Sequence, residues 1–296
     1  MKLWEHNYSE IYALYNRILD FRGHGWSNVQ SMHINLPFFD DEEFGKLHAA
    51  VRIILPLIPA LSCSSPIFEG KNTGYKDARM QVYKTNQKEI PEMTGKVIPE
   101  QVFNRKDYFE KIFLPINTAI AIYDTEKVLD HHFLNSRGAI ARFDRKAIEI
   151  RVIDLQECPA ADVAIAVLII EVLKLLVGEE VVSTRDQMQW KEDDLLEIFN
   201  NVIENGENSL INNLEYVNLF DFENNATAGI IWQRLYERVK VGISLKHRDT
   251  LEFILHNGSL ATRILKAVGS DYSQGNINRV YTHLEECLKN NKPFKP

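Results

Sequence analysis

The sequence predicts an α+β protein in which an antiparallel sheet is backed by helices and followed by a helical C-terminal part. Residues Val29–Phe38 alternate between apolar and polar side chains, and residues Gly138–Asp154 do so on both sides of a predicted turn. After Trp190 only helical spacing is found. Strands followed by a run of helices are typical of the α+β class. We therefore expect a sheet domain over residues 1–185 with the ligand site, and a helical subdomain over 186–296 packed on it.

The composition is that of a globular protein that binds small molecules. The 296 residues are 45% hydrophobic and 25% charged, which is sufficient for a large buried core. The formal net charge of −7 argues against a broad surface for nucleic acid, because such surfaces are strongly basic. Any anion is therefore expected to be bound by local arginines, and the expected partners are small molecules.

Several features favour the cytoplasm. The sequence contains three widely separated cysteines, Cys63, Cys158 and Cys287. They form no CxxC pair, so neither a disulfide framework nor a zinc knuckle is indicated. Residues 1–21 are amphipathic and carry acidic side chains, unlike a signal peptide. The most apolar stretch, Val163–Val177, is too short for a bilayer and contains Glu171 and Lys174, so we expect a buried helix and no membrane partner.

The first elements follow from local signals. Residues 1–21 have the spacing of an amphipathic helix, which Gly23-His24-Gly25 is expected to end. Residues Val29–Phe38 then alternate and predict a strand. Asp40 or Asp41 is placed to cap the next helix, since a carboxylate at this position accepts hydrogen bonds from free backbone N–H groups.

That next helix is expected to be interrupted near its end. Pro56 and Pro59 lack a backbone N–H and should kink or split the last turns. Residues 62–79 are rich in Ser, Gly and Pro and predict a long loop, and such loops are often functional. A further helix is expected around 108–122.

The second half begins with the clearest strand signal. Residues Gly138–Asp154 predict a hairpin whose turn lies near Asp144-Arg145-Lys146. Pro159 is placed to begin the buried helix, because proline is tolerated in the first turn. Three glycines suit the C-terminal ends of later helices: Gly206, Gly258 and Gly269.

The two predicted strands each present one polar face. In the first strand the polar side is formed by Ser31, His33 and Asn35. In the second strand the apolar side is expected to consist of Ile148, Ile150 and Val152. Glu149 and Arg151 then project together from the opposite side. A carboxylate suits magnesium and arginine suits phosphate, but an ordinary solvated face with an ion pair is the commoner outcome of alternation alone.

Four blocks of the sequence carry a resemblance to a known family. They are His33–Phe38 (HINLPF), Leu55–Arg79, Arg142–Gln156 and, more weakly, Asn257–Arg263 (NGSLATR). Within the second block, ALSCSSPIFEGKNTG is the most specific stretch. In the order and spacing of these blocks the chain resembles the glutamate-cysteine ligase family of the bacterial carboxylate-amine ligase type over nearly its whole length.

The resemblance implies a fold and a reaction. The implied fold is that of glutamine synthetase, with a curved antiparallel sheet whose concave polar face binds ATP, Mg2+ and an amino acid. The implied reaction phosphorylates the glutamate γ-carboxylate with ATP, after which an amine such as cysteine displaces phosphate, as in glutathione biosynthesis. The protein would act mainly by positioning substrates and neutralising charge.

Site residues are also implied by the resemblance. The implied metal-site residues are His33 and Glu149. The implied catalytic residues are Arg79 and Arg151. The implied substrate contacts are Arg79, Ser64 and Ser65. The implied nucleotide contacts are Asn35, Arg142 and Arg145.

One feature departs from the family pattern. Members normally begin with a strand bearing closely spaced glutamates that hold magnesium, and no Glu-x-Glu strand precedes His33. Glu5 and Glu10 lie in a helical pattern instead. We therefore expect either a piece of a longer protein or a metal site that lacks some of its carboxylates.

Other interpretations stay open at this level. The chain could be a non-catalytic paralogue or subunit that binds a glutamate-like ligand or a partner chain. A phosphagen-kinase-like phosphotransferase also lines a curved sheet with arginines, although the His33–Phe38 block favours the ligase. Arg145 could simply lie exposed in the hairpin turn. The adjacent pair His131-His132 is expected at the surface with diverging side chains, hence not on a shared metal. A homo-oligomer is neither indicated nor excluded.

Overall fold

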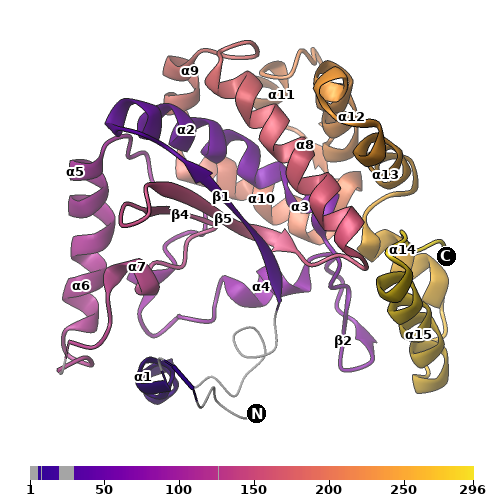
Figure 1. The fold of residues 1–296 in the computed structure, drawn as a ribbon, viewed down its shortest axis with the longest axis horizontal. Coiled ribbons are helices and arrows are strands. Elements are labelled where there is room, and N and C mark those ends of the chain that lie inside the picture. Colours follow the sequence, from indigo (N-terminus) through magenta and orange to yellow (C-terminus); the bar gives the residue numbers. More distant parts are fainter. Residues whose placement is uncertain (1–5, 8, 20–29, 126) are drawn as a thin grey trace.

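The computed structural model describes residues 6–7, 9–19, 30–125 and 127–296 of the chain. The predicted break at Gly23-His24-Gly25, the first strand residue Val29, and Glu5 lie outside these residues. Within them, helices and small antiparallel sheets are combined (Figure 1), so the prediction of a mixed helix and sheet protein is confirmed. No described helix has both the length and the apolar character needed to cross a membrane.

The described elements follow one another in two runs. The first run contains α1 (Ser9–Leu19), β1 (Ser31–Pro37), α2 (Asp41–Ile54), η1 (Leu55–Leu57), α3 (Pro59–Ser62), β2 (Ile67–Phe68), β3 (Lys71–Asn72), α4 (Ala78–Tyr83), η2 (Pro91–Met93), α5 (Arg105–Tyr108), η3 (Phe109–Phe113), α6 (Leu114–Ile120), α7 (His131–Leu134), β4 (Ala139–Arg142), β5 (Ala147–Asp154) and α8 (Pro159–Val177). The second run contains α9 (Thr184–Gln189), α10 (Glu192–Asn205), η4 (Gly206–Asn208), β6 (Leu210–Ile211), α11 (Leu214–Asn218), β7 (Ala226–Thr227), α12 (Ala228–Val239), η5 (Lys240–Gly242), α13 (Leu245–Asn257), α14 (Leu260–Val268) and α15 (Gln274–Asn290).

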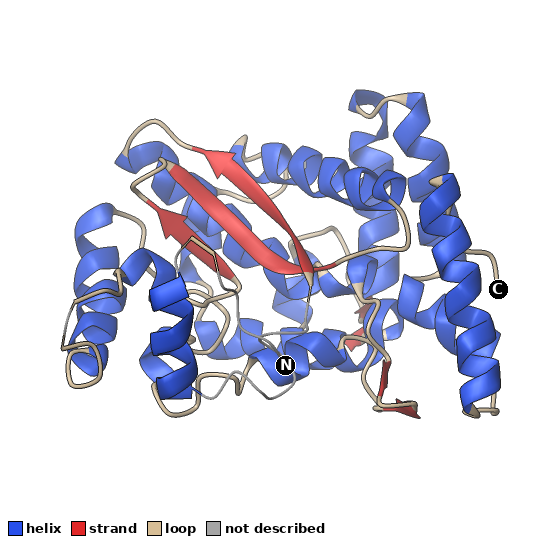
Figure 2. Ribbon diagram, turned by 60° about the horizontal axis from the view of Figure 1, so that its bottom comes forward, coloured by secondary structure: helices blue, strands red, loops and turns tan. Residues whose placement is uncertain are grey.

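The largest described sheet has three antiparallel strands in the order β1-β5-β4, so the first predicted strand pairs with the predicted hairpin. The hairpin itself is confirmed, with its turn between Arg142 and Ala147 and a hydrogen bond from Arg145 N to Arg142 O of 2.9 Å. Figure 2 shows the three strands crossing in front of several helices. β5 therefore lies in the middle of the sheet, paired with β1 on one side and with β4 on the other.

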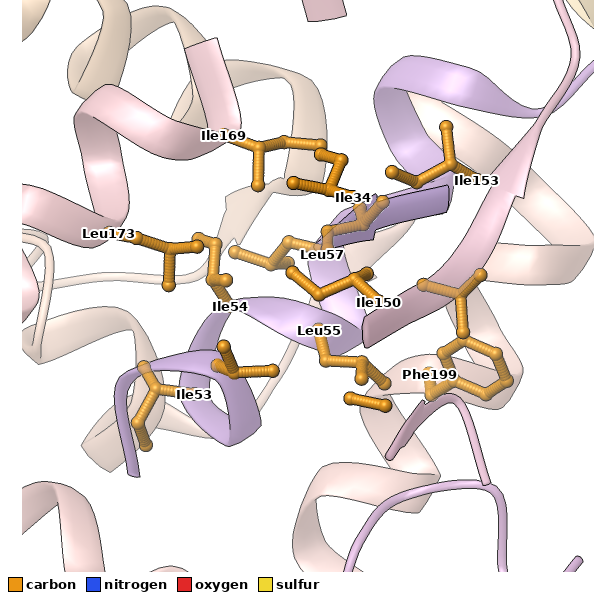
Figure 3. Close-up of a cluster of buried hydrophobic side chains, with 14 of the residues drawn as sticks. Ile34, Ile53, Ile54, Leu55, Leu57, Ile150, Ile153, Ile169, Leu173 and Phe199 are labelled. Carbon is orange, nitrogen blue, oxygen red and sulfur yellow. The ribbon is translucent and has the colours of Figure 1, made fainter. Parts of the chain in front are cut away.

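One face of this sheet packs on helices. Ile34 and Ile150 are paired across β1 and β5, and both are buried. Figure 3 shows them among Leu57, Ile54 of α2 and Ile169 of α8. Because burying large aliphatic side chains is the main favourable term in folding, this layer fixes which face of the sheet turns inward. The opposite face is left for polar side chains.

A β-bulge changes the alternation near the end of β5. Ile34 pairs with Ile150, but Met32, two residues earlier, pairs with Ile153 rather than Val152. One additional residue is thus inserted in β5, and a one-residue shift moves every following side chain to the other face. The predicted apolar residues Ile148, Ile150 and Val152 are all buried in the core, and the bulge adds Ile153, which pairs with Met32. Asp154, paired with Ser31, joins the polar face.

The predicted signals at helix ends are largely confirmed. Asp40 caps α2 and accepts hydrogen bonds from Glu42 N and Glu43 N, both at 3.0 Å. The helix gives way to a 3₁₀ turn and then to α3 at the two prolines, as expected. Pro159 begins α8. The three glycines end α10, α13 and α14, and each has a positive φ, which residues other than glycine rarely adopt.

Two local predictions need correction. The stretch 62–79 was expected to be a loop, but it contains the short hairpin of β2 and β3 and the first residues of α4. The last third was expected to be wholly helical, but β6 pairs there with β7. Both pairs contain only two residues per strand, too few for an alternation to be visible in the sequence. The division into domains at residue 185 stays a prediction.

Candidate active site

Glu149 is the centre of the polar face of the sheet. It lies on the middle strand, and three side chains approach its carboxylate. His33 Nδ1 of β1 is 3.1 Å from Oε1, Arg151 Nε is 3.3 Å from Oε1, and Arg142 Nη1 of β4 is 3.7 Å from Oε2. Each strand of the sheet thus contributes one of the basic groups, which the antiparallel register places beside the acid.

Burial and the basic neighbours of Glu149 act on its pKa in opposite directions. Burial favours the neutral form of Glu149, but the hydrogen bond with His33 and the positive charges of Arg151 and Arg142 outweigh it, so the pKa is lowered. His33 is further oriented by a 2.9 Å contact between its Nε2 and Ser31 Oγ. The carboxylate is therefore ionised and held by an excess of positive charge.

Arg142 extends the polar network to the hairpin turn. Its guanidinium binds Asp144 in a bidentate manner, with distances of 3.0 Å from Nε and 2.9 Å from Nη2. The hydrogen bonds to Asp144 raise the pKa of Arg142 further. Arg145, in contrast, is 60% exposed and contacts Asp144 at 3.6 Å, away from Glu149. The structure thus groups Arg142 with the polar face and places Arg145 at its margin.

A second carboxylate, that of Asp154, binds residues of the Ser/Gly-rich segment 62–79. Its Oδ2 accepts hydrogen bonds from Ser64 N and from Ser65 Oγ, both at 2.8 Å. Its Oδ1 is paired with Arg79 Nε from α4. Arg79 Nη1 also reaches the carbonyl oxygen of Arg151 at 3.5 Å, which connects this cluster with the surroundings of Glu149. Residues 75 to 90 positions apart are brought together in this way.

Asp77, just before α4, is a second acid beside this cluster. It caps α4 through a 2.8 Å hydrogen bond from Met80 N and is fully buried. Burial and the nearby charge of Asp154 raise its pKa well above the usual range, although Arg79 opposes them.

The predicted site residues are therefore arranged as two adjoining groups. His33, Arg142 and Arg151 surround Glu149, and Ser64, Ser65 and Arg79 surround Asp154. Asn35 lies directly opposite Glu149 in the strand pairing, with its side chain exposed. Only Arg145 stands apart. The roles assigned to these residues stay predictions, but their grouping on one side of the sheet is what a shared site requires.

Asp154 was missed as a site residue from the sequence. Its position after strict alternation indicated only a strand end, because the bulge that rotates it onto the polar face leaves no sequence signal. The hydrogen-bonding capacity of Arg79 is not fully used, because its Nη2 is buried and makes no hydrogen bond within the described part of the chain. A guanidinium donor left over in this way fits an anionic ligand oxygen.

The histidine pair differs from expectation. His131 and His132 were predicted to diverge at the surface, but their ring centroids are 4.4 Å apart and both side chains are partly buried. Phe113 packs against both rings, at 4.2 Å and 5.1 Å. Packing against Phe113 thus holds the two histidine rings of the short helix α7 together.

The chain is similar to known sequences over most of its length. It is 33% identical over 299 aligned positions to an uncharacterized protein of Archaeoglobus fulgidus. The alignment covers 99% of this chain and 72% of that protein. The model of glutamate-cysteine ligase family 2 (GCS2) matches residues 3–283. That match includes both carboxylate groups of the polar face and all the predicted site residues. The chain therefore belongs to glutamate-cysteine ligase family 2.

Proposed function

We propose that this chain is an ATP-dependent carboxylate-amine ligase that forms a γ-glutamyl amide through an acyl phosphate. The observation that carries the proposal is the convergence of three arginines and a histidine on two carboxylates at one side of the sheet. Family membership supports the ligase class. We further propose a glutamine synthetase-like fold, glutamate and cysteine as substrates, and a cytoplasmic role in glutathione biosynthesis, whereas the curved sheet that the resemblance implied is not seen.

The basic groups fit an anionic substrate. Arg79 has a spare donor, Nη2, and arginine presents a planar fork that matches a carboxylate or a phosphate. Arg151 and Arg142 have 22% and 8% of their side chains exposed, so a ligand on the polar face would reach Arg151 first. A phosphate group entering between Arg151 and His33 would compete with Glu149 for their N–H donors. In the structure His33 Nδ1 lies 3.1 Å and Arg151 Nε 3.3 Å from Glu149 Oε1.

The fit to Mg2+ is weaker. Of the described residues, only Glu149 provides a carboxylate beside His33, and no third His, Cys, Asp or Glu completes a ligand set there. Magnesium commonly keeps several waters and is held through one or two carboxylates and the substrate phosphates. Glu149 would therefore be the protein ligand, and bound Mg2+ would neutralise phosphate charge.

The chain's own residues would act by binding and orientation. In the proposed reaction a glutamate carboxylate oxygen attacks the γ-phosphorus of ATP, ADP leaves, and the amine then attacks the acyl carbon while phosphate leaves. Arg151 and Arg142 would bind the phosphoryl oxygens, whose charge is spread in the transition state. Arg79 is held by Asp154 in a fixed orientation and would bind the substrate carboxylate. Ser64 and Ser65 would maintain this position through Asp154.

The test measures phosphate release by the purified chain with ATP, Mg2+, glutamate and a panel of amines that includes cysteine. We expect amine-dependent release, reduced by about 10² to 10³ in Arg151→Gln, because a preorganised charge at a transferred phosphoryl group has effects of that size. Arg185 lies exposed on α9, outside the polar face, and Arg185→Gln is the matched control. Equal rates of phosphate release by Arg151→Gln and Arg185→Gln would show that Arg151 and the polar face take no part in the reaction.

A second function is favoured by the incomplete metal ligand set. If Glu149 is too firmly held by its basic neighbours to accept Mg2+, the same groups would still bind a glutamate-like anion without catalysis. A non-catalytic paralogue, subunit or fragment would then use this surface to bind a ligand or a partner chain. Calorimetric titration with glutamate separates the two functions, because binding without any phosphate release identifies the second.

A further inference from the structure

A cluster of potential metal ligands lies outside the proposed active site. One ligand atom from each of Asp130, His131 and His132 lies within 4.8 Å of those of the other two. A fourth group, Asp144 of the hairpin turn, has its Oδ1 3.7 Å from His132 Nε2. Four side chains with lone pairs thus approach one another where α7 meets the turn between β4 and β5.

The hydrogen bonds leave His132 prepared for a ligand. Its Nδ1 is 2.7 Å from Asp130 Oδ1, and a carboxylate at this distance holds the proton on Nδ1. The lone pair then resides on Nε2, which is buried and makes no hydrogen bond within the described residues. A carboxylate that orients one nitrogen while the other binds the ion is the usual arrangement of metal-bound histidine.

The surroundings of the histidine pair allow access from solvent. Phe113 packs against both rings. Both histidines also line a pocket of about 610 Å³ whose wall includes Phe109 and Phe143. An ion can therefore reach the cluster from solvent.

We propose that His131, His132 and Asp144 form a binding site for a divalent ion of the zinc type, with Asp130 as the outer partner that orients His132 through Nδ1. Mixed imidazole and carboxylate ligands favour Zn2+ and related first-row ions, whereas Mg2+ prefers oxygen ligands alone. The site is separate from the magnesium of the proposed reaction and does not depend on that reaction. Since Asp144 also binds Arg142, the ion would join α7 to the hairpin that carries Arg142.

The test is a titration of the full-length chain without a histidine tag, using zinc chloride in competition with a chromophoric chelator. We expect one equivalent of Zn2+ to bind, and magnesium chloride in a separate titration to leave the chelator signal unchanged. His132→Gln is expected to weaken binding by at least about 10- to 100-fold, since even the loss of an outer partner has effects of that size. Asp130→Asn keeps a residue that can cap α7 and should still weaken binding.

The control is His256→Gln on α13, because His256 is exposed and remote from the cluster in sequence. It should bind zinc as the unaltered chain does. Circular dichroism of each variant establishes that the fold is retained, and Asp144→Asn provides an independent variant if His132→Gln unfolds. Absence of zinc binding by the unaltered chain, or equal binding by folded His132→Gln, Asp144→Asn and His256→Gln, would overturn the proposal. The cysteines are buried and outside the cluster.

Discussion

Arg79 and Asp154 form an ion pair in which both side chains are almost removed from solvent, with exposures of 4% and 2%. The acid stands at the end of β5 and the base in the first turn of α4, so the pair connects the sheet with the Ser/Gly-rich segment. Asp154 also binds Ser64 and Ser65. A buried charge without its partner is costly, so the integrity of this junction depends on both members.

The first prediction concerns the stability of that junction. Asp154→Ala should lower the free energy of unfolding by about 3 to 5 kcal/mol, because it leaves the Arg79 guanidinium buried and unpaired. Urea denaturation followed by circular dichroism measures the loss. The exposed Asp249 on α13 supplies the control, and Asp249→Ala should change stability by less than about 0.5 kcal/mol.

A double variant makes the same prediction sharper. If the two charges are coupled, Asp154→Ala combined with Arg79→Met should be less destabilised than the sum of the two single losses, since each single variant strands one buried charge. Simple additivity would contradict the pairing as the source of the effect.

The second prediction separates two neighbouring arginines of the hairpin. Arg142 approaches Glu149 and is almost covered, while Arg145 is exposed and contacts only the margin of the polar face. Arg142→Gln should weaken ATP binding about tenfold or more, since a charge-assisted hydrogen bond contributes about 1.5 to 3 kcal/mol. Arg145→Gln should change it less than about twofold, because exposed ion pairs contribute little. Calorimetric titration with ATP and Mg2+ provides both values, and a larger effect at Arg145 would reverse the assignment.

The third prediction tests the N-terminal cap of α2. Asp40→Ala removes two 3.0 Å hydrogen bonds to backbone N–H groups and should cost about 1 kcal/mol of unfolding free energy. Asp40→Ser can still cap the helix and should cost clearly less, which is measured by urea denaturation of both variants. Equal losses would mean that the carboxylate stabilises α2 by charge rather than by capping.

The sequence was most informative where a local pattern decides the structure. Alternation predicted β1 and the first residues of β5, and proline and aspartate predicted where α2 and α8 begin. The bulge opposite His33 could not be predicted, because a one-residue insertion is set by how two strands pair and not by either strand alone. For this reason Asp154 was assigned to the strand end.

The candidate site shows the same division. Glu149 and Arg151 were placed on one face by alternation, and the structure agrees. The approach of Ser65 to Asp154 joins segments 89 residues apart and has no local signal. His131 and His132 also could not be predicted, since their close rings result from packing on Phe113. Chemistry that depends on long-range contacts was therefore visible only through the resemblance to a family.

The last prediction uses the pH dependence of stability. The pKa of Glu149 is lowered in the folded chain, despite its burial, by His33, Arg151 and Arg142. A group whose pKa falls on folding stabilises the protein above its unfolded pKa, and this contribution is lost as the pH falls through the folded value. The unaltered chain should thus exceed Glu149→Gln in unfolding free energy at pH 7, and the difference should shrink as the pH is lowered below about 4.5.

Urea denaturation at pH 7, 5, 4 and 3.5 measures this difference, with Glu285→Gln on the exposed side of α15 as the control. The control should show little difference from the unaltered chain at any of these pH values, because Glu285 is exposed. A Glu149→Gln difference that stayed constant from pH 7 to pH 3.5 would mean that the carboxylate is not ionised against its basic neighbours. The proposed binding of anions would then lose its electrostatic basis, because Arg142 and Arg151 would no longer be held in place by a charge that a substrate can displace.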